Sequence, residues 1–132
     1  MCRIACSCAI ALALAACDHT SRDRMFHGRT VGEEANGTTI GMGVGEQVTV
    51  ALTSPGDSGY SNWTIASTPD SGVVAWTSSE HQAPPSGAGP GNFGTDVFDF
   101  EAVAAGSTSV VATAVRPWSG ETLTFSVTFT VH

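Results

Sequence analysis

The C-terminal part of the chain alternates between apolar and polar residues. Within residues 122–131 every second position is apolar: Leu123, Phe125, Val127, Phe129 and Val131. Thr or Ser fills the positions between them, and a period of two predicts a β-strand with one face in a core and the other in water. Shorter stretches of alternating or β-branched residues predict further strands at 38–42, 47–53, 63–65, 73–76, 96–103 and 107–115.

The segments between these strands are rich in Gly, Pro and Ser, and no stretch shows the helical period. About seven short strands separated by such turns predict an all-β fold, an immunoglobulin-like antiparallel β-sandwich. A domain of about 100 residues buries somewhat over 60% of the surface of its unfolded chain, which is enough for a stable core. We expect that core to hold the large aromatic side chains of the strands: Trp63, Trp76, Phe98, Phe100, Phe125 and Phe129.

The first 16 residues differ in character from the rest. Arg3 is followed by an apolar run over residues 4–16, which is typical of a secretory signal peptide. The run is too short to cross a bilayer, which takes about 20 residues. Its end, Leu14-Ala15-Ala16-Cys17, resembles the lipobox of bacterial lipoproteins. The resemblance implies cleavage before Cys17 and lipidation of its thiol; the alternative is an ordinary cut beside an incidental cysteine.

The chain is therefore expected to have three regions. Residues 1–16 form the lipoprotein signal peptide, residues 17–36 the lipidated Cys17 and a flexible polar tether, and residues 37–132 the immunoglobulin-like domain. This organisation predicts an exported bacterial lipoprotein that Cys17 anchors to the membrane, because several acyl chains make anchoring durable. It faces the periplasm or the outer cell surface, and the choice between inner and outer membrane stays open.

Cysteine and histidine usage limits the chemistry of the mature domain. All four cysteines lie within the signal or at its edge: Cys2, Cys6, Cys8 and Cys17. The domain therefore folds without disulfides and has no thiol for a zinc site or for a nucleophile. The four histidines have no short spacing: His19, His27, His81 and His132. We expect no bound metal and no cofactor.

The charge balance excludes further classes of function. The chain has 12 acidic residues, 5 arginines and no lysine, with a net charge of −7, so it has no basic stripe for nucleic acid. Loop serines 54, 58 and 119 lack a histidine in a triad context, so we expect no enzyme. Beyond residue 30, Arg116 is the single cation against ten carboxylates and calls for an explanation. We expect a monomer.

Three predicted loops collect at one end of such a sandwich, as antibody loops do. They span residues 54–60, 87–94 and 116–120. Their prolines fix φ and their glycines allow close backbone approach, so the loops can be stiff. Trp118 offers a large rigid anchor for an interface, and Arg116 adds a planar cation beside it. Such loops suit a surface that fills a groove with little loss of entropy.

The three loops also carry motifs that match a known family in order. They are Pro55 with Ser58-Gly59-Tyr60 and Trp63, then Gly91-Asn92-Phe93-Gly94, then Arg116-Pro117-Trp118. Over roughly residues 37–131 the chain resembles the chagasin-type inhibitors of papain-like cysteine proteases. The resemblance implies reversible, non-covalent blocking of the enzyme's cleft by three loops. It implies that the following residues contact the protease: Pro55, Asp57, Ser58, Gly59, Tyr60, Gly91, Asn92, Phe93, Gly94, Arg116, Pro117 and Trp118.

The first loop departs from the family's pattern. Ser54 precedes Pro55 where the family usually has Asn, Asp57-Ser58 stands in place of Thr-Thr, and the spacing to Trp63 is longer. The alternative interpretation is a generic bacterial immunoglobulin-like surface or adhesion module without protease-inhibitor activity. Stretches such as residues 44–50 and 75–79 look like that class, which has no need of the Arg-Pro-Trp motif.

Overall fold

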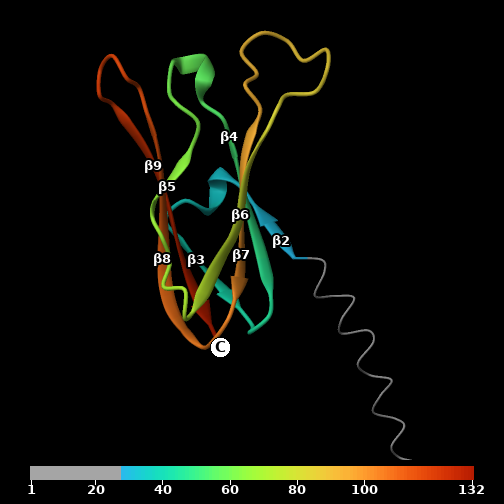
Figure 1. Ribbon diagram of the computed structural model, residues 1–132, viewed down its shortest axis with the longest axis vertical. Helices are drawn as coiled ribbons and strands as arrows, with labels where there is room; N and C mark the ends of the chain where they lie inside the picture. The colour runs from blue at the N-terminus through green and yellow to red at the C-terminus, as the bar shows by residue number, and fades with distance from the viewer. Residues whose placement is uncertain (1–27) are drawn as a thin grey trace, which may run out of the picture.

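Two four-stranded sheets pack face to face in the computed structural model, which describes residues 28–132 (Figure 1). One sheet has the order β2-β4-β7-β6 and the other β3-β9-β8-β5. The described residues form the strands β2 (Arg29–Val31), β3 (Thr38–Met42), β4 (Gln47–Thr53), β5 (Thr64–Ser67), β6 (Val74–Gln82), β7 (Thr95–Ala102), β8 (Gly106–Val115) and β9 (Thr122–Val131). The prediction of an all-β sandwich is confirmed. None of the helical turns in this part of the chain is long and apolar enough to cross a membrane.

The core lies between the sheets and follows the alternation of the sequence. The side chains of Phe98 and Phe100 on β7, and of Phe125 and Phe129 on β9, are at most 4% exposed. The ring centroids of Phe100 and Phe129 lie 5.3 Å apart, so these two side chains join the two sheets. Trp63 is half-buried and packs against the same cluster. The predicted core is confirmed for these five aromatic residues.

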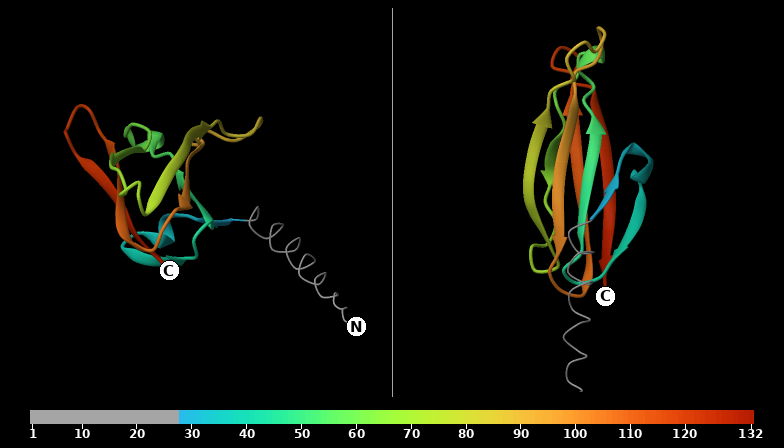
Figure 2. Two further views of the ribbon diagram at one scale, coloured as in Figure 1. Left: turned by 60° about the horizontal axis from the view of Figure 1, so that its bottom comes forward. Right: turned by 90° about the vertical axis from the view of Figure 1, so that its right-hand side faces the viewer.

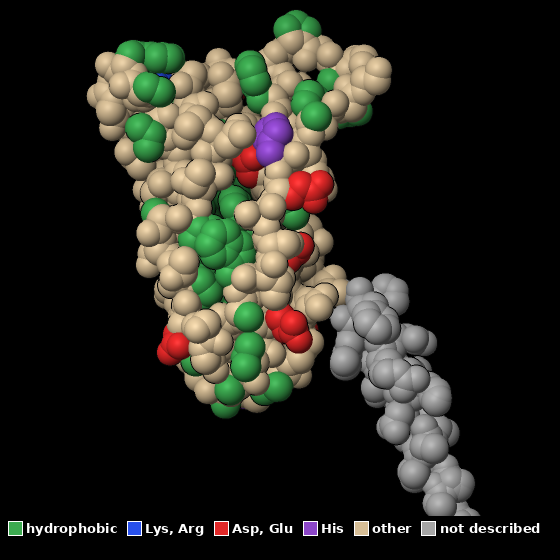
Figure 3. Space-filling model, viewed as in Figure 1, with side chains coloured by type: hydrophobic (Ala, Val, Ile, Leu, Met, Phe, Trp, Pro, Cys, Tyr) green, Lys and Arg blue, Asp and Glu red, His purple; other side chains and the backbone are tan. Residues whose placement is uncertain are grey.

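Trp76, the sixth aromatic residue assigned to the core, is 39% exposed, so that prediction is wrong. Trp76 faces the interior side of its sheet, opposite Phe100 in the register, but β6 is an edge strand, and within residues 28–132 no further strand pairs with its outer side. The register of β6 shifts between Trp76 and Ser78, and the indole Nε1 donates a hydrogen bond to the Ser78 carbonyl at 3.1 Å. Figure 3 shows apolar side chains exposed at mid-height on this side of the molecule.

The sheets are mixed, which corrects the expectation of a purely antiparallel sandwich. β2 runs parallel to β4, and β3 runs parallel to β9; the other pairings are antiparallel. A hairpin forces two paired strands to run antiparallel, but the chain passes from one sheet to the other between β2 and β3. Each of these strands therefore pairs with a strand that is distant in sequence, and its direction is not fixed by a short turn.

Residues 28–36 are ordered, although the flexible tether was expected to extend to residue 36. Strand β2 pairs with β4, and the 3-10 turn Glu33–Ala35 buries Ala35 against the core at 6% exposure. The Gly32 N–H donates to the Glu34 carboxylate at 2.9 Å, which lowers the pKa of Glu34. Val31 and Ala35 give this segment apolar contacts that its polar composition conceals. The signal peptide, Cys17 and the rest of the tether lie outside the described residues.

Candidate functional site

Three loops lie side by side at one end of the sandwich (Figure 1). The first loop (residues 54–63) joins β4 to β5, the second loop (83–94) joins β6 to β7, and the third loop (116–121) joins β8 to β9. They meet there because β4, β6 and β8 all run toward this end. The prediction that the three motifs share one end is confirmed. We call the outer side of these loops the loop surface.

The first loop lies between the other two and is stiffened by its own backbone. Its 3-10 turn Gly56–Ser58 follows Pro55, whose carbonyl accepts the Ser58 N–H at 3.1 Å and the Tyr60 N–H at 3.3 Å. Gly59 ends the turn with φ +86°, a conformation that favours glycine. Asp57 and Ser58 lie exposed at the tip of the turn.

The first and third loops are in direct contact. A Cβ added to Gly59 would lie 2.0 Å from Cη2 of Trp118, so the indole packs on the bare backbone of Gly59. At the base of the loops, the Ser61 N–H donates to the Val115 carbonyl at 2.8 Å, and the Val115 N–H donates to Ser61 Oγ at 3.0 Å. Glycine at position 59 is therefore required both by its φ angle and by the position of Trp118.

Arg116 points inward between these two loops, which explains the isolated cation. Its Nε donates to the Ser58 carbonyl at 3.1 Å, and its guanidinium forms an ion pair with Glu121. The guanidinium carbon lies 4.5 Å from the centroid of the Tyr60 ring and 5.7 Å from that of Trp118. Only 26% of the Arg116 side chain is exposed. The guanidinium is therefore used within the protein, against four neighbours from the first and third loops.

The second loop contacts the first loop from the other side. A Cβ on Gly56 would lie 2.7 Å from Cγ of Phe93, so the Phe93 ring rests on Gly56 as Trp118 rests on Gly59. The Ser54 N–H donates to the Gly94 carbonyl at 3.0 Å, and the Gly94 N–H donates to Asn92 Oδ1 at 3.0 Å. Phe93 remains 47% exposed and Trp118 73% exposed. The loop surface thus has an exposed tip at Asp57 and Ser58 with an aromatic ring on each side.

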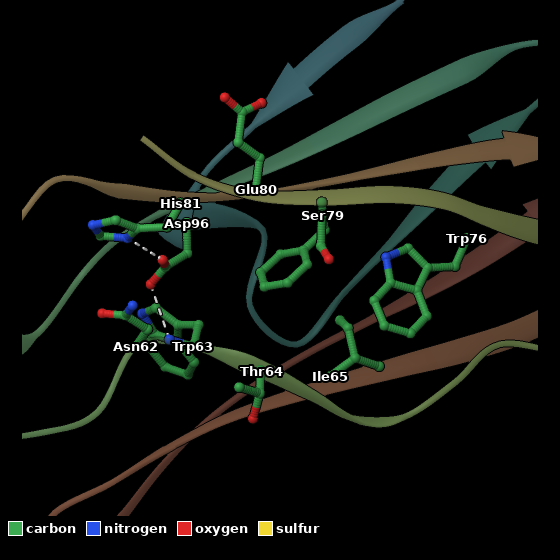
Figure 4. A pocket seen from close by; sticks show the side chains of 10 residues that line it. Asn62, Trp63, Thr64, Ile65, Trp76, Ser79, Glu80, His81 and Asp96 are labelled. Atoms are coloured by element: carbon green, nitrogen blue, oxygen red, sulfur yellow. Dashed lines mark hydrogen bonds and ion pairs between the residues drawn. The ribbon is translucent and has the colours of Figure 1, made fainter. Parts of the chain in front are cut away.

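A buried carboxylate below the loops was missed in the sequence analysis. Asp96 is 3% exposed; its Oδ2 accepts the Trp63 N–H at 2.9 Å, and its Oδ1 lies 2.7 Å from Nδ1 of His81 (Figure 4). This side chain ties the end of the first loop to the strands on both sides of the second loop. The available signal was that Asp96 falls in phase with the inward residues of β7.

A cleft of about 370 Å³ opens beside this carboxylate, between the edge strands β5 and β6. Ile65, Trp76 and Phe98 line its apolar part, and Asp96 and His81 line its polar end (Figure 4). Within residues 28–132 no group of His, Cys, Asp and Glu could hold a metal ion. The loop serines 54 and 119 donate to Asn62 and Glu121, and neither hydrogen-bonds to a histidine in this part of the chain.

The described geometry is that of a binding surface, and comparison with known proteins identifies its family. A family profile described as "Chagasin family peptidase inhibitor I42" matches residues 42–132. The chain belongs to the chagasin family. It is therefore a peptidase inhibitor and not an enzyme, and family membership favours inhibition of cysteine proteases over a generic surface module. A search of curated protein sequences gives no match for this chagasin-family chain.

Several solved structures share the same sandwich fold. The solution structure of amebosin is 25% identical, with a TM-score of 0.62, over 80% of this chain and 98% of that one. The cysteine protease inhibitor EhICP2 from Entamoeba histolytica is 13% identical, with a TM-score of 0.60, over 79% and 94% of the two chains. PbICP-C, solved in complex with falcipain-2, is 15% identical, with a TM-score of 0.60, over 80% and 100%. The two less similar structures show that the chagasin-family fold is shared.

Proposed function

We propose that the loop surface enters the active-site cleft of a papain-like cysteine protease and blocks it reversibly, without a covalent bond. The observation that carries this proposal is the joining of the three loops into one row through Gly56 and Gly59. The row is wide in Figure 1 and narrow when seen from the side in Figure 2. A narrow row suits entry into a groove. The complex of PbICP-C with falcipain-2 supports a partner of this class.

Preorganisation is the physical basis of this mode of inhibition. Free loops lose conformational entropy when they bind, at a cost of about 0.5–1.5 kcal/mol for each flexible side chain that becomes fixed. Here the first loop is already held by Phe93 on one side and by Trp118 on the other. In the proposed complex Ser58 and Gly59 approach the catalytic centre, while the second and third loops lie along its two sides. Trp118 then packs against an apolar part of the enzyme.

A titration of proteases tests this proposal. Residues 18–132 would be added to papain and to falcipain-2 during hydrolysis of a fluorogenic peptide, with trypsin as the control enzyme. We expect equimolar, reversible loss of activity in the cysteine proteases, and an unchanged trypsin rate. Equimolar inhibition is also the behaviour expected of a monomer. If neither cysteine protease is inhibited by micromolar protein, the generic immunoglobulin-like module becomes the better interpretation.

We further propose that the chain is an exported lipoprotein anchored through Cys17 at the periplasmic or outer face of the membrane. The support is the apolar run of residues 4–16 followed by Leu14-Ala15-Ala16-Cys17. In bacteria expressing the full chain, mass spectrometry should find Cys17 as an acylated N-terminus in the membrane fraction. Cys17→Ser should release the protein from that fraction. An unmodified Cys17 in soluble protein would overturn the proposal.

A further inference from the structure

We propose that Arg116 is a positioning residue, which holds Trp118 and the first loop in the binding arrangement and does not itself recognise the protease. This inference rests on the proposed function. It departs from the expectation for the family motif, in which Arg116 counts among the residues that contact the enzyme. The geometry supports the new role because the contacts of the guanidinium lie within the inhibitor.

The contacts of Arg116 within the protein occupy two of its five N–H donors and pair its charge with a carboxylate. Nε donates to the Ser58 carbonyl at 3.1 Å, and a terminal nitrogen bonds to Glu121. The guanidinium carbon lies over the Tyr60 ring, 4.5 Å from its centroid, where a cation is attracted by the ring. A protease side chain that bound Arg116 would have to compete with all of these neighbours. The neighbouring Trp118, in contrast, is 73% exposed.

The same contacts determine where Trp118 lies. The turn of the third loop is closed by hydrogen bonds from the Ser119 and Gly120 N–H groups to the Arg116 carbonyl, at 3.2 and 2.8 Å. The Arg116 side chain joins this turn to the Ser58 carbonyl. The next residue along the first loop, Gly59, is the one on which the Trp118 indole packs. Without the guanidinium, the base hydrogen bonds at Ser61 would remain, but the outer half of the third loop would lose its hydrogen bond to the first loop, and only the packing of the indole on Gly59 would join them.

The fold provides a matched control at its other end. Arg29 also bonds to a carboxylate, that of Glu46, and donates to a backbone carbonyl, that of Gly41. It pairs in register with Val48 near the start of β4, away from the loop surface. Arg29→Ala therefore removes an ion pair and a hydrogen bond to a backbone carbonyl, as Arg116→Ala does, without touching the three loops.

The test compares Arg116→Ala, Arg116→Lys and Arg29→Ala in residues 18–132 labelled with 5-fluorotryptophan. The fluorine resonance of Trp118 is assigned by its loss in Trp118→Phe. In Arg116→Ala we expect this resonance to shift or broaden in the free inhibitor, because the indole is no longer held. The inhibition constant for papain should rise about 10- to 100-fold, mainly through faster dissociation. Lysine keeps the charge but not the planar contact, so Arg116→Lys should give a partial rescue.

Three results would overturn the inference. An unchanged Trp118 resonance together with weaker inhibition would mean that Arg116 contacts the protease directly. Unchanged inhibition by Arg116→Ala would mean that the third loop needs no such tie. An equal effect of Arg29→Ala would point to a general loss of folding. Failure of the proposed function is distinguishable, because the unsubstituted protein would then not inhibit papain, whereas the fluorine signal of the free protein would still report on Arg116.

Discussion

Trp118→Ala is expected to weaken inhibition of papain by about 2 kcal/mol or more, which is about a 30-fold rise in the inhibition constant. The indole is 73% exposed in the free protein, so its apolar surface remains available for burial against an enzyme. Tryptophan is among the residues enriched at binding hot spots, where truncation to alanine costs about 2 kcal/mol or more. For the same reason its loss should change the free energy of unfolding little. Inhibition assays and denaturant titrations of the variant measure the two effects separately.

Trp76→Ala is the matched control for this prediction. Trp76 is also a solvent-exposed tryptophan, but it lies on edge strand β6 beside the cleft and outside the three loops. We expect Trp76→Ala to leave the inhibition constant within about two-fold of that of the unsubstituted protein, since it removes no contact of the loop surface. Loss of inhibition in Trp76→Ala with full activity in Trp118→Ala would place the interface on the flank of the sandwich instead.

Phe100→Ala should reduce the free energy of unfolding by about 3–5 kcal/mol, the range found when a buried phenylalanine is cut to alanine. Phe100 is 1% exposed and packs against Phe129 of the opposite sheet, so its removal leaves a cavity between the two sheets. Because small domains are stable by only about 5–15 kcal/mol, this single change could remove much of the total. Urea titration monitored by circular dichroism gives the value.

Phe93→Ala makes the same chemical change at a different depth. Phe93 is 47% exposed and packs on Gly56 in the loops, so its loss should cost about 1 kcal/mol or less in the free energy of unfolding. The contrast between the two phenylalanines tests whether the loop surface is separate from the cooperative core. Equal destabilisation by the two variants would contradict the division between core and loops described above.

The strand bounds were predictable where apolar and polar residues alternate strongly. The prediction failed for segments at the sheet edges that pair through their backbone without burying a face. Residues 47–53 and 122–131 became strands with the predicted bounds, because each buries one face between the sheets. β6 extends to Gln82, beyond the predicted end at residue 76, because its polar second half pairs with β7 without being buried. A strand that pairs through its backbone without burying a face leaves little alternation of apolar and polar residues in the sequence. The same limit applies to β2, whose three residues pair with β4 at the edge of the sheet.

The candidate site was predictable as a set of loops but not as a set of contacts. The order of Gly, Pro and aromatic residues indicated which loops form the binding surface. Their common end of the sandwich followed from the alternating strand directions. That Gly59 packs under Trp118 and that Arg116 turns inward depends on residues nearly 60 positions apart in the sequence. Such pairings are set by tertiary packing, and the pattern of a single sequence carries no record of them.

The parallel pairing of β2 with β4 determines where the proposed lipid anchor would be attached relative to the three loops. Arg29 lies beside Val48 near the start of β4, so the described chain joins the flank of the sandwich and not the end that carries the three loops (Figure 1). The stretch from Cys17 to Gly28 could span at most about 40 Å when fully extended. If Cys17 carries the proposed lipid, the attachment point lies away from the loop surface, and the three loops stay accessible to a protease in solution.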